Sequence, residues 1–123
     1  MAEIIWRYLN PGRLTPLNEA LDLQAQLFQQ KLNGDQRNYV LFVEHEPVYT
    51  CTPRAMRTQK IETLCKVPAK RLPAPLIELP DNHGGSITYH GPGQLVCYLI
   101  LDLSQFGVSG VRFIRAVEES ITE

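Results

Sequence analysis

The chain is poor in the features that mark membrane, secreted and nucleic-acid-binding proteins. It contains no apolar run long enough to span a membrane. Its three cysteines, an odd number without a close pair, argue against a disulfide framework and fit a reducing compartment. Its formal net charge of -1 favours neither a nucleic acid nor a membrane surface as a partner. The N-terminus lacks the basic start and apolar core of a secretory signal. The sequence therefore predicts an intracellular protein.

What remains is typical of a globular protein. The chain has 123 residues, of which 44% are hydrophobic and 20% charged, so it fits one domain or part of one. Positive charge is unevenly spread, because half of the twelve Lys and Arg residues fall in one segment with a single acid, Glu62. These residues are Arg54, Arg57, Lys60, Lys66, Lys70 and Arg71. Two interpretations stay open: a solvated loop, or a docking surface for an acidic partner.

Hydrophobic periodicity predicts strands and one helix in the first half of the chain. Residues 4–8 predict an edge strand. A helix follows, with Thr15 as its N-cap and Pro16 in its first position. Residues 39–44 predict a buried strand, and extended structure resumes over residues 48–50. The apolar stripe of the helix is expected to pack in the core, and it consists of Leu17, Ala20, Leu21, Phe28 and Leu32.

The second half is less regular. Residues 52–75 contain several prolines without a clear period, which predicts a long loop with room for one short helical turn. Short strands are expected over residues 76–79 and 87–90, and the apolar run 95–101 predicts a centrally buried strand. Ser109 is the expected cap of a final helix. The apolar stripe of that helix is Val111, Ile114, Val117 and Ile121.

The last turn of this helix carries an unfavourable charge. Glu118, Glu119 and Glu123 lie at its C-terminal end, where negative charge opposes the helix dipole, and no glycine caps it. We therefore expect the helix, and the domain, to continue beyond residue 123.

The segment from His83 to Gln94 is the most informative part of the sequence. It places four glycines and one proline among a histidine pair and several hydroxyl and amide side chains. Glycine carries an entropic cost, so such a cluster indicates tight turns or a close approach of the backbone to another group. Two turn-like pieces bracket the short β-type run 87–90. This layout suits a bound carbonyl, carboxylate or phosphate.

The run Gly84–Gln94 closely resembles the signature of the lipoyl(octanoyl) transferase family. Two flanking segments, His45–Thr50 and Leu99–Leu103, resemble the motifs that surround that signature, and the similarity extends in register from about Ile4 to the C-terminus. The resemblance implies an α/β (α+β) fold with a mixed β-sheet flanked by helices, shared with biotin and lipoate protein ligases. Residues 1–123 would then form the N-terminal portion of a single catalytic domain.

The resemblance also implies an activity and its partners. The family moves an octanoyl group from acyl carrier protein to a lysine on lipoyl domains of 2-oxo acid dehydrogenases and on the glycine cleavage H protein. It needs no cofactor or metal, and it is cytoplasmic in bacteria and mitochondrial in eukaryotes. The related ligases use a more glycine-rich triplet and lack the Gly91–Gln94 continuation, so this continuation favours the transferase over an ATP-dependent ligase.

By the same resemblance, one stretch lines the acyl-substrate pocket. Its residues are His83, Gly84, Gly85, Ser86, Ile87, Thr88, Tyr89 and His90. In a strand, Thr88 and His90 share one face, and Ile87 and Tyr89 share the other. Two roles stay open for His90: a hydrogen-bond donor or orienting group at the site, or a structural histidine. Pro92 is expected to shape a turn.

The sequence departs from the family pattern at two places. The family usually has an arginine at the position of His83, so a fixed positive charge is replaced by a titratable one. It usually has a glycine followed by arginines near Thr52–Arg54, where only Arg54 matches. Both differences bear on substrate affinity.

The family's chemistry uses a cysteine nucleophile assisted by a lysine, and both lie downstream of the segment that this chain resembles. No catalytic residue is therefore expected here. Cys97 is expected to be a buried, inert thiol within its strand, and neither Cys51 nor Cys65 matches the nucleophile. Four hypotheses follow: the pocket-bearing part of an octanoyltransferase, a non-catalytic module that binds acyl carrier protein, a ligase of the same fold, or a segment that does not fold alone.

Overall fold

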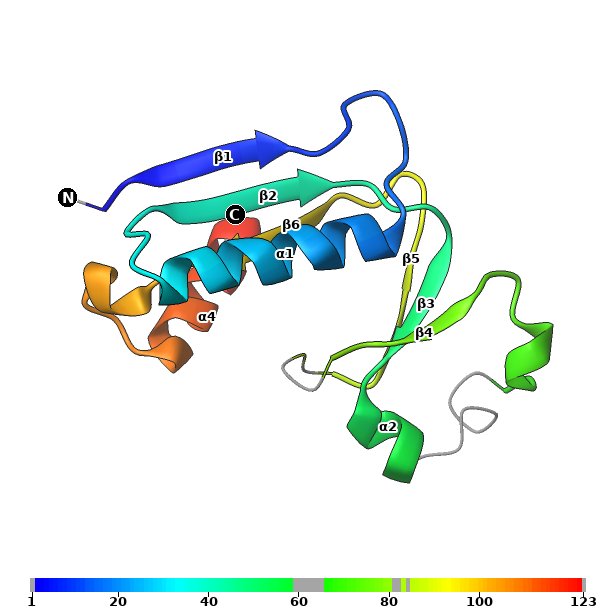
Figure 1. Cartoon of the computed structure of the whole chain (residues 1–123). Helices are drawn as coiled ribbons and strands as arrows, with labels where there is room; N and C mark the ends of the chain where they lie inside the picture. Colours follow the sequence, from blue (N-terminus) through cyan, green and yellow to red (C-terminus); the bar gives the residue numbers. More distant parts are fainter. Residues whose placement is uncertain (1, 59–65, 81–82, 84, 123) are drawn as a thin grey trace. The chain divides into compact units, whose positions relative to one another are not determined.

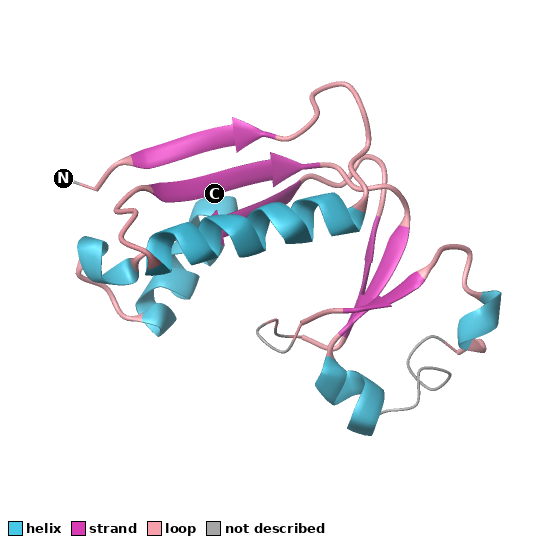
Figure 2. Ribbon diagram, viewed as in Figure 1, coloured by secondary structure: helices cyan, strands magenta, loops and turns pink. Residues whose placement is uncertain are grey.

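The computed structural model describes residues 2–58, 66–80, 83 and 85–122. The chain divides into two compact units, which we describe separately. The first unit comprises Met1–Tyr8, Leu21–Phe42 and Cys97–Glu123, and the second comprises Leu9–Ala20 and Val43–Val96. Each contains strands and helical segments (Figure 1; Figure 2). The predicted α/β class is confirmed, although the strands form two three-stranded sheets rather than one sheet.

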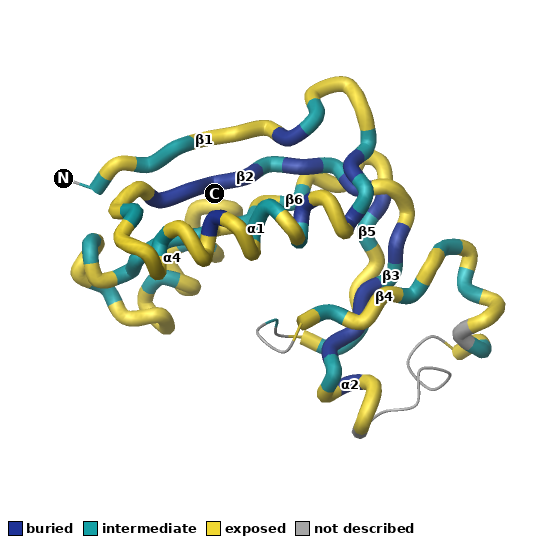
Figure 3. Tube along the Cα trace, in the orientation of Figure 1, coloured by how far each residue is buried: buried dark blue, intermediate teal, exposed yellow. Residues whose placement is uncertain are grey.

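The sheet of the first unit has the order β1-β2-β6. Its strands are β1 (Ile4–Tyr8), β2 (Asn38–Val43) and β6 (Val96–Ile100). β1 and β2 are parallel, with Ile4 opposite Asn38 and Tyr8 opposite Phe42. β1 lies at the edge, as predicted, and β2 is the buried strand that its β-branched and aromatic residues indicate. Figure 3 shows this burial as the dark blue stretch of β2.

The helix α1 (Leu17–Leu32) packs on this sheet through a different face from the predicted one. The core cluster consists of Leu27, Tyr39 and Leu41, with Ile5, Leu23, Tyr98 and Ile100 packed against it. Phe28 and Leu32, which the predicted stripe placed in the core, are 55% and 65% exposed. The stripe prediction is therefore wrong for the C-terminal half of α1. Leucines at positions 23 and 27 form a second apolar row, and periodicity alone does not decide which row faces the sheet.

The strand β6 corrects another expectation. It was predicted to be centrally buried, but it lies at the edge of the β1-β2-β6 sheet. Its residues alternate between intermediate and exposed, and Leu99 is 39% exposed. An apolar run indicates burial on both faces, but the number of neighbouring strands is a tertiary property that the run itself does not contain.

The final helix, α4 (Gly110–Thr122), has the predicted cap but no buried residues. The Ser109 hydroxyl oxygen accepts a hydrogen bond from the backbone N–H of Arg112 at 3.3 Å. The predicted apolar stripe is largely open to solvent, because Val111, Ile114 and Ile121 are 64%, 58% and 77% exposed. Figure 3 shows α4 mostly in the colour of exposed residues.

A buried amide connects distant parts of the first unit. The side-chain oxygen of Asn38 accepts hydrogen bonds from the backbone N–H of Asp102 at 2.7 Å and from Lys31 Nζ at 3.2 Å. Its amide nitrogen donates to Gln105 Oε1 at 3.0 Å. Asn38 is fully buried, so these bonds satisfy a group that would otherwise be costly to bury. They hold the 3₁₀ turn η2 (Leu103–Phe106) against the start of β2.

The second unit contains a mixed sheet of order β4-β3-β5. β3 (Val48–Cys51) pairs with β4 (Leu76–Glu78) in parallel and with β5 (Ile87–His90) antiparallel. The segment predicted as a long loop contains the helix α2 (Pro53–Thr58) and the 3₁₀ turn η1 (Ala69–Arg71). In the described part of the chain, no helix combines the length and apolar character needed to cross a membrane.

Candidate functional site

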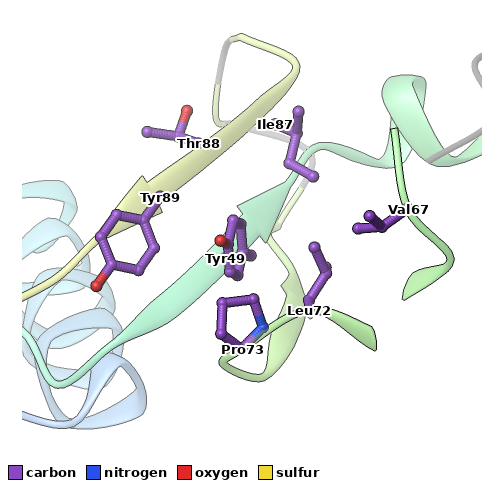
Figure 4. Close-up of a pocket in the computed structure, with 7 residues that line it drawn as sticks. All are labelled: Tyr49, Val67, Leu72, Pro73, Ile87, Thr88 and Tyr89. Atoms are coloured by element: carbon purple, nitrogen blue, oxygen red, sulfur yellow. The ribbon is translucent and has the colours of Figure 1, made fainter. Parts of the chain in front are cut away.

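The pairing of β3 with β5 forms one wall of a cavity in the second unit. Tyr49 lies directly opposite Tyr89, and Cys51 lies opposite Ile87. The rings of Tyr49 and Tyr89 are tilted by 51° with their centroids 5.1 Å apart, a favourable edge-to-face contact. The cavity has a volume of about 290 Å³. It is lined by Tyr49, Val67, Leu72, Pro73, Ile87, Thr88 and Tyr89 (Figure 4).

The opposite wall comes from the segment around η1, which leads into β4. Val67, Leu72 and Pro73 lie on this segment, which returns to the sheet where the backbone N–H of Tyr49 donates to the Pro75 carbonyl at 2.8 Å. The cavity is thus lined mostly by apolar side chains, together with two tyrosines and one threonine. Ligand cavities commonly measure about 300–1,000 Å³ and combine apolar walls with a few polar groups. This cavity lies at the small end of that range, which suits a short or narrow ligand.

The Gly91–Gln94 motif forms the turn that ends β5. The backbone N–H of Gln94 donates to the Gly91 carbonyl at 3.2 Å, and Gly93 has a φ of +84°. A proline in the second position of the turn and a glycine with left-handed backbone in the third position define a type II turn. The prediction that Pro92 shapes a turn is therefore confirmed. The Gln94 side chain accepts from the backbone N–H of Gly91 at 3.3 Å. The motif is therefore explained by its own turn geometry.

Gly91 lies against the ring of Tyr89, a residue that lines the cavity. A Cβ atom at this position would overlap the Tyr89 hydroxyl and would lie 2.7 Å from the Tyr89 Cζ atom. The Tyr89 ring therefore folds back over a backbone position that has room for hydrogen only.

Thr52 fixes the other end of β5. Its backbone N–H donates to the Ser86 carbonyl at 3.0 Å, and its hydroxyl donates to the Gly85 carbonyl at 3.1 Å. The same hydroxyl oxygen accepts from the backbone N–H of Ala55 at 3.2 Å, which caps α2. The structure thus ties the glycine segment to the start of α2 through Thr52.

Two histidines meet next to the cavity-lining strand. His45 is fully buried, and its Nδ1 lies 3.0 Å from the Thr15 carbonyl oxygen. Because a carbonyl only accepts, Nδ1 carries the proton. Burial lowers the pKa of His45, the bond to Thr15 opposes this shift, and the nearby His90 adds to it. Its ring centroid lies 5.8 Å from that of His90.

His90 contributes an unusual buried atom. Its Nδ1 is buried and has no hydrogen-bond partner among the described residues. A buried polar atom without a partner costs about 1–3 kcal/mol, so this nitrogen is a candidate contact for a bound molecule. The backbone N–H of Gly93, in the turn that follows, donates to Glu44 Oε2 at 3.0 Å and fixes the turn beside the histidine pair.

The structure separates the predicted site residues into groups. Ile87, Thr88 and Tyr89 lie on the wall of the cavity, while His90 faces His45. Figure 4 shows the Thr88 side chain pointing away from Tyr49, as the alternation of a strand requires. His83, Gly85 and Ser86 precede this wall and are not among its lining residues, and Gly84 lies outside the described residues.

The opposite wall was not found from the sequence. Tyr49 belongs to a motif that we singled out, but its place in the cavity depends on its pairing with β5. Val67, Leu72 and Pro73 lie in the segment predicted as a loop. One signal in the sequence could have indicated this wall: the segment contains apolar residues between prolines, and apolar residues need a surface on which to pack.

The described cysteines lie outside this cavity. Cys51 is buried, and its thiol lies 3.8 Å from the Ile77 carbonyl oxygen. Cys97 is exposed on β6, so the prediction of a buried thiol is wrong, and partial desolvation raises the pKa of this thiol. Cys65 lies outside the described residues. Among the residues that the structure describes, no three His, Cys, Asp or Glu side chains are grouped to hold a metal ion.

The fold and site define an α/β domain with a small apolar cavity beside a glycine-rich strand and turn. The model of the lipoyl protein ligase A/B catalytic domain matches residues 16–123. That match covers most of the chain, and the chain therefore belongs to this family. The family resemblance inferred from the Gly84–Gln94 motif is confirmed.

Relatives that match this chain include octanoyltransferases. That of Chloroflexus aggregans is 34% identical over 102 residues, which are 83% of this chain and 44% of the relative. That of Bacteroides fragilis is 36% identical over 113 residues, covering 88% of this chain and 49% of the relative. The octanoyltransferase of Persephonella marina is 38% identical over 108 residues, which cover 87% of this chain and 48% of the relative. The chain thus spans about half the length of the curated relatives it matches.

Proposed function

We propose that this chain takes part in protein lipoylation by holding an octanoyl group during its transfer from acyl carrier protein to a lysine. The acceptors would be the lipoyl domains of 2-oxo acid dehydrogenases and the glycine cleavage H protein. The observation that carries this proposal is the position of Ile87 and Tyr89, from the family motif, on the wall of an apolar cavity. The octanoyltransferase relatives support the same reaction. The reaction takes place inside the cell, in the bacterial cytoplasm or the mitochondrion.

The proposed site comprises the motif residues and the cavity. The acyl chain packs against the apolar walls, since burying its methylene groups is favourable by about 0.8 kcal/mol each. In this proposal His83, Gly85 and Ser86 lie toward the thioester end, where a carbonyl oxygen needs hydrogen-bond donors. His90 lies at the other end of β5 and faces His45, so its ring is not assigned to the reacting group.

The nucleophile is not one of the described cysteines in this proposal. In the first step of transfer, a thiolate attacks the acyl carbon, displaces the carrier thiol and forms an enzyme thioester. In the second step, the lysine amine attacks this thioester, forms the amide and releases the thiolate, which takes up the proton lost by the amine. Cys51 is buried with its thiol beside a backbone carbonyl, and Cys97 belongs to the other unit. The proposal therefore assigns the attacking thiol to neither Cys51 nor Cys97.

A binding measurement tests the acyl site. Octanoyl-pantetheine added to the 123-residue chain should shift the NMR resonances of Ile87, Tyr89 and Tyr49. Ile87→Asp should weaken binding roughly tenfold, because it places a charge in an apolar wall. Ile77→Asp is the matched control, since Ile77 is 39% exposed on β4 and does not line the cavity. Equal losses in the two variants would contradict the proposed site.

A transfer assay tests the position of the nucleophile. The chain, mixed with octanoyl-acyl carrier protein and an apo lipoyl domain, should transfer no octanoyl group. Turnover that is abolished by Cys51→Ser or Cys65→Ser would show that the nucleophile lies within these residues.

Two alternatives make different predictions. The matching family also includes lipoyl protein ligases, and a ligase would form an acyl-adenylate from ATP and a free fatty acid. Release of pyrophosphate that depends on octanoate would favour this reading. A non-catalytic module would bind acyl carrier protein but would not support transfer even when the remaining part of the catalytic domain is supplied.

A further inference from the structure

The first unit has a cavity of its own, which is lined by residues of the edge strand β1, the helix α1 and the first part of β2. Its volume of about 490 Å³ lies within the usual range of ligand cavities. The aliphatic side chains that line it belong to the core cluster or pack against it, and they are Ile5, Leu23 and Leu27. The polar side chains of the lining include Arg7, Gln26, Gln30 and Arg37. We call this cavity the β1 groove.

The charge of the β1 groove comes from one arginine. Arg37 is balanced by Asp35, whose carboxylate oxygens accept from its guanidinium at 2.9 Å and 3.2 Å. Arg7 is exposed, and no ion pair among the described residues involves it. The glutamine amides add hydrogen-bonding groups without charge. A ligand of the groove therefore meets apolar side chains and one positive charge, which favours a ligand that is both apolar and acidic.

The same strand directs backbone groups to an open side. β1 has β2 on one side and no strand of the described chain on the other (Figure 1). The Glu3 carbonyl accepts from the backbone N–H of Asn38 at 2.9 Å. Alternate residues of a parallel strand bond to the same neighbour, so Ile5 faces β2 while Ile4 and Trp6 direct their backbone groups to the open side. Proline and charges commonly protect such edges, but β1 contains no proline and one charged residue.

The other face of this edge is also apolar. Side chains alternate along a strand, so Trp6 lies on the face opposite to Ile5 and Arg7. Trp6 is 64% exposed, and its ring stacks on Phe42 with the centroids 6.0 Å apart. A strand added to β1 would place alternate side chains in the β1 groove and against the Trp6 ring. Both faces of such a strand would therefore gain contacts, in addition to its backbone hydrogen bonds.

We propose that β1 and its groove bind an extended segment of a partner protein as an additional strand of the β1-β2-β6 sheet. On one face, the segment carries an apolar side chain that packs on Leu23 and Leu27. Two residues away on the same face, it carries an acidic side chain that pairs with Arg7. A second copy of this chain fits less well, because its β1 would bring another arginine and no acid to the groove. This inference concerns the first unit and does not depend on the proposed function.

The test uses synthetic peptides and the fluorescence of Trp6, the single tryptophan of the chain. The probe contains Glu-Thr-Leu-Thr-Glu between threonines, so an acid reaches Arg7 whichever way the strand runs. Binding should change the fluorescence and slow hydrogen exchange at the amides of Ile4 and Trp6, but not at that of Ile5, which already faces β2. The same peptide with every backbone amide N-methylated should bind roughly tenfold more weakly, because it has no donors for the edge.

A paired substitution tests the charge. Arg7→Gln should weaken binding of the glutamate peptide about two- to fivefold. The loss should vanish when the peptide carries glutamine in place of glutamate. Arg112→Gln removes an exposed arginine of α4 and should bind the peptide as the wild type does.

Four results would overturn the proposal. Equal binding of the N-methylated peptide would exclude strand addition, and equal losses in Arg7→Gln and Arg112→Gln would exclude the pairing with Arg7. Absence of binding at millimolar peptide would exclude the site. Sedimentation of the chain alone supplies the fourth result: a dimer that the peptide dissociates would make a second copy, rather than a partner protein, the occupant of this edge.

Discussion

Among the described residues, the two units of this chain differ in the polar side chains that they bury: one in the first unit, Asn38, and four in the second. In the first unit, α1 packs on β1, β2 and β6 through apolar side chains around Leu27 and Leu41. In the second unit, the four buried polar residues are Thr15, His45, Thr50 and Thr52. The hydroxyls of Thr50 and Thr52 donate to backbone carbonyls, and His45 bonds to the backbone carbonyl of Thr15. The Thr15 hydroxyl oxygen accepts from the Asn10 side chain. Apolar packing is non-directional, whereas hydrogen bonds fix the positions of particular backbone atoms. The candidate cavity lies in the unit where strand ends and turns are fixed in this directional way.

The largest expected effect tests the apolar contacts of the first unit. Leu27→Ala should lower the free energy of unfolding by about 2–5 kcal/mol, because Leu27 is 5% exposed in the core. The adjacent Phe28→Ala should cost less than about 1 kcal/mol, since Phe28 is 55% exposed. Chemical denaturation measures both values. The reverse order would mean that the originally predicted stripe faces the sheet.

The next effect tests the directional contacts of the second unit. Thr52→Val should destabilise the chain by about 1–2 kcal/mol, because it removes the cap of α2 and the bond to Gly85. Thr52→Ser keeps the hydroxyl and should retain most of the stability. Faster hydrogen exchange at Ala55 in the valine variant alone would locate the loss. If both variants are equally destabilised, the methyl group rather than the hydroxyl is responsible.

A smaller effect is expected in the turn that follows β5. Gly93→Ala should cost about 1 kcal/mol, because Gly93 has a φ of +84° in the left-handed region. Gly93→Asn should cost less, since asparagine tolerates this conformation better than alanine. Thermal melts of the two variants provide the comparison. An alanine variant as stable as the wild type would exclude the type II turn.

The smallest effect at neutral pH concerns His45. Its pKa is lowered in the folded state, so below its ordinary value of 6.5 the unfolded chain binds more protons. The stability that depends on neutral His45 is therefore present above pH 6.5 and is lost as the pH falls below it. His45→Gln should flatten the pH dependence of unfolding below pH 6.5. His90→Gln, which keeps His45, should preserve most of the slope; an unchanged slope in His45→Gln would contradict this assignment.

Local patterns predicted the elements whose determinants are local. The strands Ile4–Tyr8 and Ile87–His90 and the cap at Ser109 follow from alternation and from a side-chain oxygen that precedes a helix. The position of α1 was nearly right, although it begins at Leu17, one residue later than expected. Thr15 preceding it instead forms a bridge with His45, a contact between residues far apart in the sequence.

The errors arise where burial depends on neighbours from elsewhere in the chain. The apolar run of β6 could not reveal that this strand has an edge position, and the two apolar rows of α1 could not reveal which one meets the sheet. In the candidate site, the motif supplied Ile87, Thr88 and Tyr89. Leu72 and Tyr49 join them only through strand pairing and through the return of an irregular segment.

Gly91 shows how a residue outside a cavity can set its dimensions. The Tyr89 ring rests over Gly91, so any side chain there would swing the aromatic ring toward Tyr49 or out into solvent. Substitution at this glycine would thus alter the aperture between the two tyrosines without adding an atom to the lining. Selectivity for ligand width can change through a position that no bound molecule touches.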